Sequence, residues 1–340
     1  MARIVLGAGS SHTPILTLPA EEWEHRAAAD YANPRLNHSD GRFVSYGELL
    51  AEMGDRYEAD ASVESLRRKA ALCQAALDRL ADAVERAAPD VVVIVGDDQE
   101  ELFSPANQPA VAIFYGEEVV TSSRFGADEL PDWMQVVGRG YLMDDAHVLP
   151  GAPDLARDVI AGLLERNIDI AVASRVDDPA KAGFGHAYGF IVRRLFKGRG
   201  IPVLPVLLNT YYPPNVPSAA RCLDIGRALG QAIEASPLDL RVAIIASGGL
   251  SHFIVDETLD RRVLESMASG APEALRNIPR AALNSGSSEI LNWVLAAGAI
   301  GGLPMAWCEY QPIYRTPAGT GIGVAVAVWG AADNLEGSPK

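Results

Sequence analysis

Cysteine is scarce in this chain of 340 residues, and the few that occur are poorly placed for covalent or metal chemistry. The three cysteines, Cys73, Cys222 and Cys308, are far apart in the sequence and form no CxxC pair. Their odd number and wide spacing argue against a disulfide framework and against a thiolate zinc site. Cys73 falls in an apolar helical stripe, so we interpret it as a small core residue.

Positive charge and long apolar runs are also lacking. Lys and Arg number 29 against 44 Asp and Glu, which gives a net charge of −15, and no run is rich in Lys or Arg. Such a surface repels a phosphate backbone, so nucleic acid is excluded as a partner. The first apolar run is too short for a signal peptide and no other reaches membrane-spanning length. We therefore expect a cytoplasmic protein with no membrane partner.

What the chain does contain is a series of short runs rich in Val, Ile and Leu. Hydrophobic residues make up 49% of the sequence, which is enough to build a large core. The runs are continuous rather than alternating, which is typical of strands that are buried on both faces. They begin at Ile4, Val91, Ala110, Ile170, Val203, Val242 and Val324.

Helical patterns lie between these runs. The clearest spans Ser62 to Ala88, where apolar residues recur at steps of three and four. Strands that alternate with helices predict an α/β fold, with a central, mostly buried mixed sheet covered by helices on both faces. We expect one large domain over residues 1–332. Within it, the more polar residues 17–61 are expected to form an excursion that serves as a lid or an oligomer contact, and residues 333–340 are expected to form a frayed tail.

Polar side chains gather where several of the predicted strands end. In open α/β sheets ligands bind outside such strand ends, so these groups are expected to share one crevice. They are His12 in GAGSSHTP, then Asp97, Asp98 and Gln99 after the VVVIV run, and His252 in IIASGGLSHF.

Two further polar residues stand near predicted helix starts, His186 in GFGHAYGF and Glu289 in NSGSSEIL. Each of these polar residues also has an ordinary structural explanation. Histidines and aspartates are common in turns, and a glutamate in the first turn of a helix can form a capping box. Taken together, however, two imidazoles and a carboxylate with open positions match the facial triad of non-haem Fe(II) oxygenases.

Five motifs follow one another along the chain in a distinctive order: SSHTP, GDDQEELF, GHAYGF, SGGLSH and SGSSEILNWVLAAGA. This order resembles the class III extradiol ring-cleaving dioxygenases of the LigB type, from about Ile4 to about Trp329. The segments LNTYYPPNVPSAARC and YQPIYRTPAGTGIG are most similar to the 3-O-methylgallate dioxygenase subgroup. The resemblance implies an enzyme that cleaves the aromatic ring of a catechol or gallate-like substrate with O2.

The resemblance also implies roles for individual residues. In that family a mononuclear Fe(II) is bound by a histidine of the SSH motif, a histidine after the next core strand and a glutamate of the late helix. These positions correspond to His12, Gln99 and Glu289 in this sequence. The family further implies that His252 of the SGGLSH motif is the catalytic acid or base, and that His186 faces the substrate.

Gln99 departs from the family pattern. Members of the family read NDH or PDH where this sequence reads DDQ, so an amide replaces one imidazole ligand. A carbonyl oxygen is a weaker donor to Fe(II) than imidazole, so metal affinity is expected to fall. We expect Gln99 to bind the metal directly. The alternatives are that it holds a water that binds the metal, or that Asp97, Asp98 or His38 takes its place.

The predicted partners are a small aromatic diol and O2, and the chain is expected to form a homo-oligomer, a dimer. Tyr188 and Tyr212 are expected to bind the substrate, with Tyr211 as a further residue of an aromatic slot, although core packing explains tyrosines equally well. A carboxylate on the ring would need a cation. The arginines considered for this role are Arg42, Arg221 and Arg315.

Two other classes of function remain open at this point. One is a divalent-metal hydrolase or lyase, in which Asp97, Asp98 and Glu289 form an oxygen-rich site for Mg2+ or Mn2+. The other is a protein that binds no metal and uses the same fold for binding alone.

Overall fold

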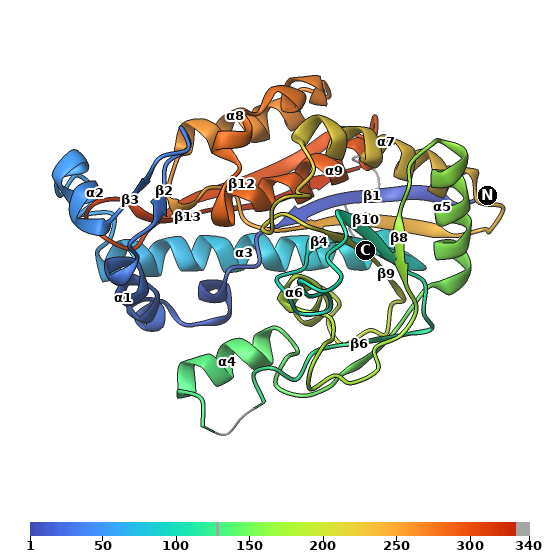
Figure 1. Ribbon diagram of the computed structural model, residues 1–340, viewed down its shortest axis with the longest axis horizontal. Helices are drawn as coiled ribbons and strands as arrows, with labels where there is room; N and C mark the ends of the chain where they lie inside the picture. The colour runs from blue at the N-terminus through green and yellow to red at the C-terminus, as the bar shows by residue number, and fades with distance from the viewer. Residues whose placement is uncertain (127–128, 331–340) are drawn as a thin grey trace, which may run out of the picture.

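A nine-stranded mixed sheet forms the centre of the computed structural model, which describes residues 1–126 and 129–330 (Figure 1). The strand order is β11-β13-β1-β10-β4-β9-β5-β8, and β12 also pairs with β13. The four central strands β1, β10, β4 and β9 run parallel, whereas β13 runs antiparallel to β1, and β5 to β9. The predicted mixed α/β sheet is therefore confirmed. The predicted tail at 333–340 lies outside the described residues.

All seven predicted apolar runs form strands of this sheet. The strands are β1 (Arg3–Ser10), β4 (Val91–Asp97), β5 (Val111–Phe114), β8 (Ala171–Ala173), β9 (Val203–Leu208), β10 (Arg241–Ser247), β11 (His252–Ile254), β12 (Met305–Tyr314) and β13 (Thr320–Trp329). Two short hairpins lie outside it and comprise β2 (Leu36–Asn37) with β3 (Phe43–Val44), and β6 (Glu118–Val120) with β7 (Val148–Pro150).

Strand β4 illustrates why these runs are continuous in hydrophobicity. Successive side chains of a strand point to opposite faces of the sheet. Val91, Val93 and Val95 belong to one core cluster, and Val92 and Ile94 belong to the cluster on the other face. All five are buried because helices cover both faces.

Helices α5, α7, α8 and α9 contribute to one core cluster, and α3, α4 and α6 to the other, on opposite faces of the sheet (Figure 1). The predicted helix from Ser62 to Ala88 is α3, which begins where the Ser62 hydroxyl accepts a hydrogen bond from the Ser65 amide. The helices are α1 (Glu24–Ala32), α2 (Tyr46–Met53), α3 (Val63–Ala87), α4 (Asp132–Gly140), α5 (Pro153–Glu165), α6 (His186–Leu195), α7 (Ala219–Ala235), α8 (Glu257–Ala268) and α9 (Ile290–Ile300). None of the helices in the described part of the chain has the length and apolarity that crossing a membrane requires.

The polar excursion at residues 17–61 is folded onto the rest of the chain. It contains α1, the β2–β3 hairpin and α2. Asp30 of α1 accepts two hydrogen bonds from the guanidinium of Arg315, at 2.8 and 3.0 Å, and a third from the Thr320 hydroxyl. Asp30 and Arg315 are both buried, so this ion pair fixes α1 against the connection between β12 and β13.

Candidate active site

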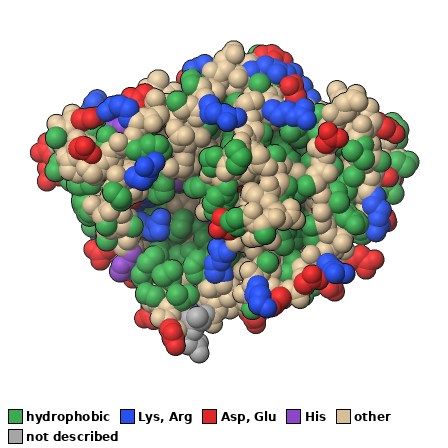
Figure 2. All heavy atoms as spheres, viewed as in Figure 1, with side chains coloured by type: hydrophobic (Ala, Val, Ile, Leu, Met, Phe, Trp, Pro, Cys, Tyr) green, Lys and Arg blue, Asp and Glu red, His purple; other side chains and the backbone are tan. Residues whose placement is uncertain are grey.

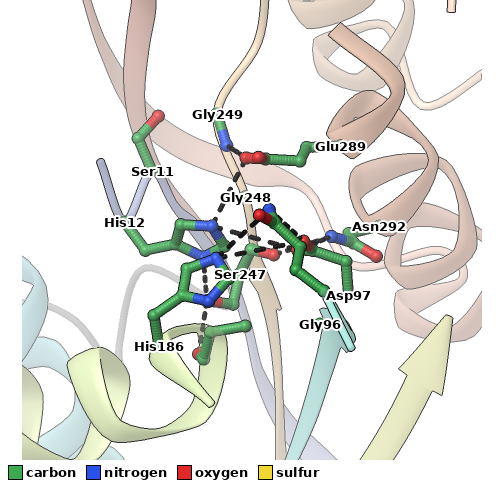
Figure 3. Close-up of polar contacts among 12 residues, drawn as sticks. Ser11, His12, Gly96, Asp97, His186, Ser247, Gly248, Gly249, Glu289 and Asn292 are labelled. Carbon is green, nitrogen blue, oxygen red and sulfur yellow. Dashed lines mark hydrogen bonds and ion pairs between the residues drawn. The ribbon is translucent and has the colours of Figure 1, made fainter. Parts of the chain in front are cut away.

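Three neighbouring strands end at one edge of the sheet, and the polar residues collect there (Figure 3). Strands β1, β10 and β4 are adjacent and parallel, so their carboxyl ends meet, with Ser10 paired to Ser247. Asp97 is the last residue of β4, and His12 follows β1 closely. The crevice expected at these strand ends is therefore where the side chains converge.

His12 is held with one ring nitrogen bonded and the other free. Its Nδ1 lies 2.9 Å from the hydroxyl of Ser247, and that hydroxyl donates its own proton to the carbonyl oxygen of Ala187 at 2.6 Å. Ser247 must therefore accept from Nδ1–H, so Nε2 carries the lone pair in the neutral imidazole. Nε2 is buried and has no hydrogen-bond partner among the described residues.

Glu289 faces this lone pair. Its Oε2 lies 3.4 Å from Nε2 of His12 and 3.9 Å from Nε2 of His252, and it accepts a hydrogen bond from the Gly249 amide at 2.6 Å. Burial raises the pKa of Glu289, but His252, His12 and that amide together outweigh it, so the pKa lies well below its usual range. Glu289 is consequently a carboxylate. It ends a 3-10 turn (Ser285–Glu289) that leads into α9, and its side chain forms no helix cap.

Asp97 is a second buried carboxyl group beside His12. Its Oδ1 lies 3.9 Å from Nε2 of His12 and accepts from the Asn292 amide at 3.0 Å, while Oδ2 accepts from the Gln99 amide at 2.9 Å. Burial, and then the charge of Glu289, raise the pKa of Asp97. Two carboxyl groups in so small a space repel each other unless a positive charge lies between them.

His186 is the first residue of α6, as predicted, and its ring lies edge-on to that of His12 with 4.5 Å between centroids. Its Nδ1 bonds to Glu101 at 2.7 Å, and its Nε2 lies 3.4 Å from the Gln99 amide nitrogen. Burial lowers the pKa of an imidazole, but Glu101 outweighs it and raises the pKa of His186 to about 10. Gly185 is required here, because a Cβ at that position would lie 1.6 Å from the Glu101 carboxylate.

His252 lies on the other side of Glu289. Its Nδ1 bonds to the Leu250 carbonyl oxygen at 2.9 Å, which leaves Nε2 as the free lone pair. Burial lowers the pKa of His252, and this effect outweighs the negative charge of Glu289, which would raise it. The ring is therefore neutral near pH 7. The ring packs against Gly286, where a Cβ would lie 2.4 Å from its Cγ atom.

The residues present fit a divalent metal ion. His12, Asp97 and His186 each have an atom of a ligand type, and the three atoms lie within 4.8 Å of one another, although an imidazolium at His186 has no lone pair to offer. Donors bound at about 2.1 Å to one ion lie roughly 3 to 3.5 Å apart, which is the separation of the His12 and Glu289 atoms. A buried lone pair that faces two carboxyl groups lacks a positive partner, and a cation would supply it.

The polar cluster opens into a cavity of about 290 Å3. A hollow is visible in the face of the molecule drawn in Figure 2, with Lys and Arg side chains around it. The aromatic rings in the cavity wall can pack against a planar ligand. The lining residues are His12, Thr13, Pro14, Arg26, Gln99, Glu101, Arg124, Phe125, Tyr141, His186, Tyr211, His252, Phe253, Glu289 and Arg315.

A family model described as the catalytic LigB subunit of aromatic ring-opening dioxygenase matches residues 63–325. The chain belongs to this family. The resemblance expected from the motif order is therefore confirmed at the level of the LigB family, whose match takes in the Asp97, His186, His252 and Glu289 positions. His12 lies outside the matched range and joins the site through the β1–β10 pairing.

Curated relatives of this LigB-family chain are named as dioxygenases. A 2,3-dihydroxyphenylpropionate/2,3-dihydroxicinnamic acid 1,2-dioxygenase of Mycobacterium ulcerans is 35% identical over 123 residues, which cover 35% of this chain and 36% of the relative. An enzyme of the same name from Comamonas testosteroni is 28% identical over 170 residues, 50% of this chain and 45% of the relative. A gallate dioxygenase of Pseudomonas putida is 42% identical over 57 residues, 17% of this chain and 16% of the relative. The matched segments thus span less than half of each of these relatives.

The structure brings all five predicted metal-site and catalytic residues to one cluster, and it separates the alternatives that the sequence left open at the Gln99 position. The Gln99 amide nitrogen contacts Asp97 and His186, so its side chain lies at the site. Asp97 points into the site as well. Asp98 does not: its carboxylate accepts from the Leu102 and Phe103 amides at 2.8 and 3.2 Å, and burial raises its pKa to about 7. His38 lines a different pocket, where it faces Glu52 at 3.6 Å.

The two tyrosines predicted to bind the substrate, Tyr188 and Tyr212, do not lie in the cavity wall described above. The Tyr188 hydroxyl donates toward the carbonyl oxygens of Gly96 and Val206, at 3.1 and 2.9 Å, and its ring is buried in the core. Neither Tyr188 nor Tyr212 is among the described residues that line the cavity, whereas Tyr211 is. For Tyr188 the structure therefore agrees with core packing, the alternative explanation that the sequence left open.

Three residues of the site carry no clear signal in the sequence. Glu101 holds His186 and belongs to the GDDQEELF motif, so its place in that motif was the available clue. The Tyr141 hydroxyl donates to the His12 carbonyl oxygen at 2.6 Å. Arg26 reaches the cavity from α1, within the excursion expected to be a lid or an oligomer contact. Tyr141 and Arg26 are brought in only by the packing of elements that are distant in sequence.

Proposed function

We propose that this chain is a non-haem, Fe(II)-dependent extradiol dioxygenase that cleaves the ring of a catechol or gallate-like substrate with O2. The observation that carries this proposal is the buried Nε2 of His12, which has no hydrogen-bond partner in the described part of the chain and lies opposite the carboxylate of Glu289. A protein that used this fold for binding alone would have no reason to bury a lone pair without a donor. The LigB family match and the names of the relatives support the same reaction.

In this proposal His12, Gln99 and Glu289 hold the metal, and Asp97 stands beside them as a further carboxyl group. Gln99 would bind through its carbonyl oxygen after its amide group turns over, because its amide nitrogen now faces Asp97 and His186. Fe(II), when bound, supplies Lewis acidity that lowers the pKa of the diol and a route for electrons between ring and O2. One ring carbon–carbon bond beside the diol is broken, and both atoms of O2 enter the product.

His252 would act as the acid or base at the diol. Its Nε2 is unprotonated near pH 7, lines the cavity, and lies beside Glu289, so it can accept a proton from a substrate hydroxyl and return it to the product. The bond from Nδ1 to Leu250 fixes the ring in that tautomer.

His186 would position the substrate rather than take its proton. Glu101 holds its Nδ1, and its raised pKa keeps the imidazolium form, so Nε2–H is a hydrogen-bond donor to a substrate oxygen. Residues 1–332 would form one catalytic domain, with the excursion at 17–61 as a wall of the substrate cavity. We further propose that the protein is a homodimer in the cytoplasm. Analytical ultracentrifugation of the purified protein tests the dimer.

The test uses protein purified without oxygen and loaded with Fe(II), to which catechol, 3,4-dihydroxybenzoate and gallate are added in turn. We expect about one bound iron per chain, and O2 uptake that matches the loss of aromatic absorbance for at least one of these diols. Turnover that requires Mg2+ and consumes no O2 would favour a hydrolase or lyase instead. Failure to bind any divalent metal would overturn the proposal.

A further inference from the structure

Asp260 is a fully buried carboxyl group on α8 that does not line the candidate active-site cavity and has no part in the proposed reaction. Its Oδ1 accepts a hydrogen bond from the Ser251 amide at 2.8 Å. Its Oδ2 accepts from the hydroxyls of Ser251 and Tyr310, both at 2.7 Å. A carboxyl group is costly to bury, and two of the three donors that offset this cost come from the residue directly before His252.

One peptide group joins Asp260 to the ring of His252. The peptide between Leu250 and Ser251 supplies the N–H that donates to Asp260, at 2.8 Å, and the C=O that accepts from Nδ1 of His252, at 2.9 Å. This peptide is trans and planar, so its N–H and C=O point in opposite directions and turn together. The bond to Asp260 therefore sets the direction in which the Leu250 carbonyl faces the ring.

The carboxyl group also strengthens the second bond of this chain. A hydrogen bond polarises the peptide that donates it, and the carbonyl oxygen of a polarised peptide is a better acceptor for the next donor. Because a carbonyl oxygen can only accept, the Leu250 carbonyl holds the proton on Nδ1 of His252 and leaves the lone pair on Nε2. That is the tautomer which a base at the cavity needs.

Glu289 favours the other tautomer. Its Oε2 lies 3.9 Å from Nε2 of His252, and a carboxylate attracts a ring proton to the nitrogen nearest to it. Ser287 fixes the backbone of His252, since its hydroxyl accepts from the His252 amide and donates to the His252 carbonyl oxygen, at 2.8 and 2.6 Å. Those two bonds do not choose between the ring nitrogens. The Leu250 carbonyl makes that choice, and it has to outweigh Glu289.

From this chain of bonds we propose that Asp260 is a positioning residue for His252, which it holds, through the Leu250–Ser251 peptide, in the tautomer whose Nε2 can accept a proton. The inference assigns a role to a residue that touches neither the substrate cavity nor the proposed metal ligands. It rests on the proposed function for the effect on turnover. The effect on the ring of His252 does not depend on the reaction.

The first measurement observes the tautomer of His252 directly. The full-length protein without metal is labelled with 15N in its histidines, and the ring nitrogens are followed by NMR near pH 8, where the His252 ring is neutral. The His252 signals are those that His252→Ala lacks. In wild type we expect the proton on Nδ1 alone. In Asp260→Ala we expect both tautomers, because the weakened carbonyl acceptor no longer outweighs Glu289.

Turnover of the Fe(II)-loaded protein with a diol gives the second measurement. The kcat of Asp260→Ala should fall at least about tenfold, a part of the 10²- to 10⁴-fold that a positioned acid or base contributes. KM for the diol and the iron content should stay within about twofold of wild type, because Asp260 touches neither ligand. Asp260→Asn should retain most of kcat, because its amide oxygen still accepts from the Ser251 amide and the Tyr310 hydroxyl can turn to accept from its NH2 group.

Two controls separate positioning from general destabilisation. Tyr310→Phe removes one donor to the same carboxyl group and leaves the bond to the peptide, so it should lower the melting temperature without a change in tautomer or kcat. Glu257→Ala is the matched control for Asp260→Ala. Glu257 is also a carboxylate of α8 that accepts from a β12 tyrosine, Tyr314, at 2.8 Å, but it is bonded to the side chain of Arg261 rather than to the His252 loop. Glu257→Ala should keep the wild-type tautomer and kcat.

A wild-type tautomer in Asp260→Ala would overturn the inference. A fall in kcat that Tyr310→Phe shares in proportion to its loss of melting temperature would overturn it as well. If Asp260→Ala does not fold, Asp260→Leu combined with Tyr310→Phe removes donor and acceptor together, which a core tolerates better, and is compared with Tyr310→Phe alone. A changed tautomer in a protein that consumes O2 with no diol would support the inference and contradict the dioxygenase proposal alone.

Discussion

Nε2 of His12 and Oε2 of Glu289 lie 3.4 Å apart, although one residue follows the first strand and the other precedes the last helix. No hydrogen-bond donor among the described residues reaches that imidazole nitrogen. Because the two residues come from opposite ends of the chain, the site can form only when β1, β10 and α9 have assembled. Metal binding is therefore expected to stabilise the whole fold rather than one segment.

Ser247→Ala should weaken metal binding without removing a ligand. The serine hydroxyl fixes the tautomer and orientation of His12 by accepting from Nδ1–H. Loss of such a supporting bond typically costs 10- to 100-fold in metal affinity. We therefore expect an increase of about that size in the dissociation constant for Fe(II), measured anaerobically by competition with a chromogenic chelator.

Ser236→Ala is the matched control for this prediction. Ser236 is also a buried serine, but its hydroxyl donates to Asp158 at the opposite end of β10 from the site. Ser236→Ala should leave the dissociation constant for Fe(II) unchanged. It should lower the free energy of unfolding about as much as Ser247→Ala does. If both variants lost metal equally, the Ser247 effect would reflect general destabilisation.

Gln99→His should tighten metal binding. The Gln99 side chain already contacts Asp97 and His186, so an imidazole at this position can reach the same cluster. Imidazole is a better donor than an amide oxygen for Fe(II), and the chelator competition should show at least a several-fold lower dissociation constant. An unchanged dissociation constant for Fe(II) would mean that the Gln99 side chain does not bind the metal directly, and that a water or Asp97 takes its place.

The ends of the buried strands made most of this site predictable. His12 and His252 stand in Gly- and Ser-rich turns after apolar runs, and the parallel strand order brings these turns together. The sequence could not distinguish Asp97 from Asp98, because the two are adjacent and chemically equivalent. The end of β4 decides between them: Asp97 points to Asn292, and Asp98 turns to the amides of the following loop.

Residues on surface elements were the hardest to predict. Within residues 1–126 and 129–330 the edge strand β12 pairs only with β13. It is half-exposed and contains Pro312, so it lacks the continuous apolar run by which the central strands were found. Arg26 lies in a polar helix that is held over the cavity by long-range contacts, among them the ion pair between Asp30 and Arg315. Such long-range pairings leave no local pattern to recognise.

His252→Ala should slow turnover without loss of metal. The ring lies 3.9 Å from Glu289 and is held by the Leu250 carbonyl oxygen, so its removal leaves the proposed ligands in place. A positioned acid or base typically contributes about 10²- to 10⁴-fold, and the turnover number should fall by that factor. Iron content measured beside the O2 uptake rate checks this. A variant that no longer retains iron would show that His252 is a ligand.

Asp260→Asn should change how stability depends on pH. Asp260 is buried and accepts from the Ser251 amide, the Ser251 hydroxyl and the Tyr310 hydroxyl, yet burial raises its pKa to about 7. A raised carboxyl pKa means that the folded state holds a proton the unfolded state has lost. Wild type therefore loses stability as pH rises from about 4 to 7, at up to about 1.4 kcal/mol per pH unit from this group.

The asparagine side chain cannot titrate, so Asp260→Asn does not lose stability in this way. As pH rises from about 4 to 7, the unfolding free energy of the variant should therefore increase relative to that of wild type, and the difference should level off above pH 7. Urea unfolding at a series of pH values measures this difference. Asp40→Asn gives the opposite sign, because the bond to Arg42 lowers the pKa of Asp40, and its stabilising effect is present above pH 4 and lost as pH falls. A pH-independent difference for Asp260→Asn would mean that its three donors keep the carboxylate charged throughout.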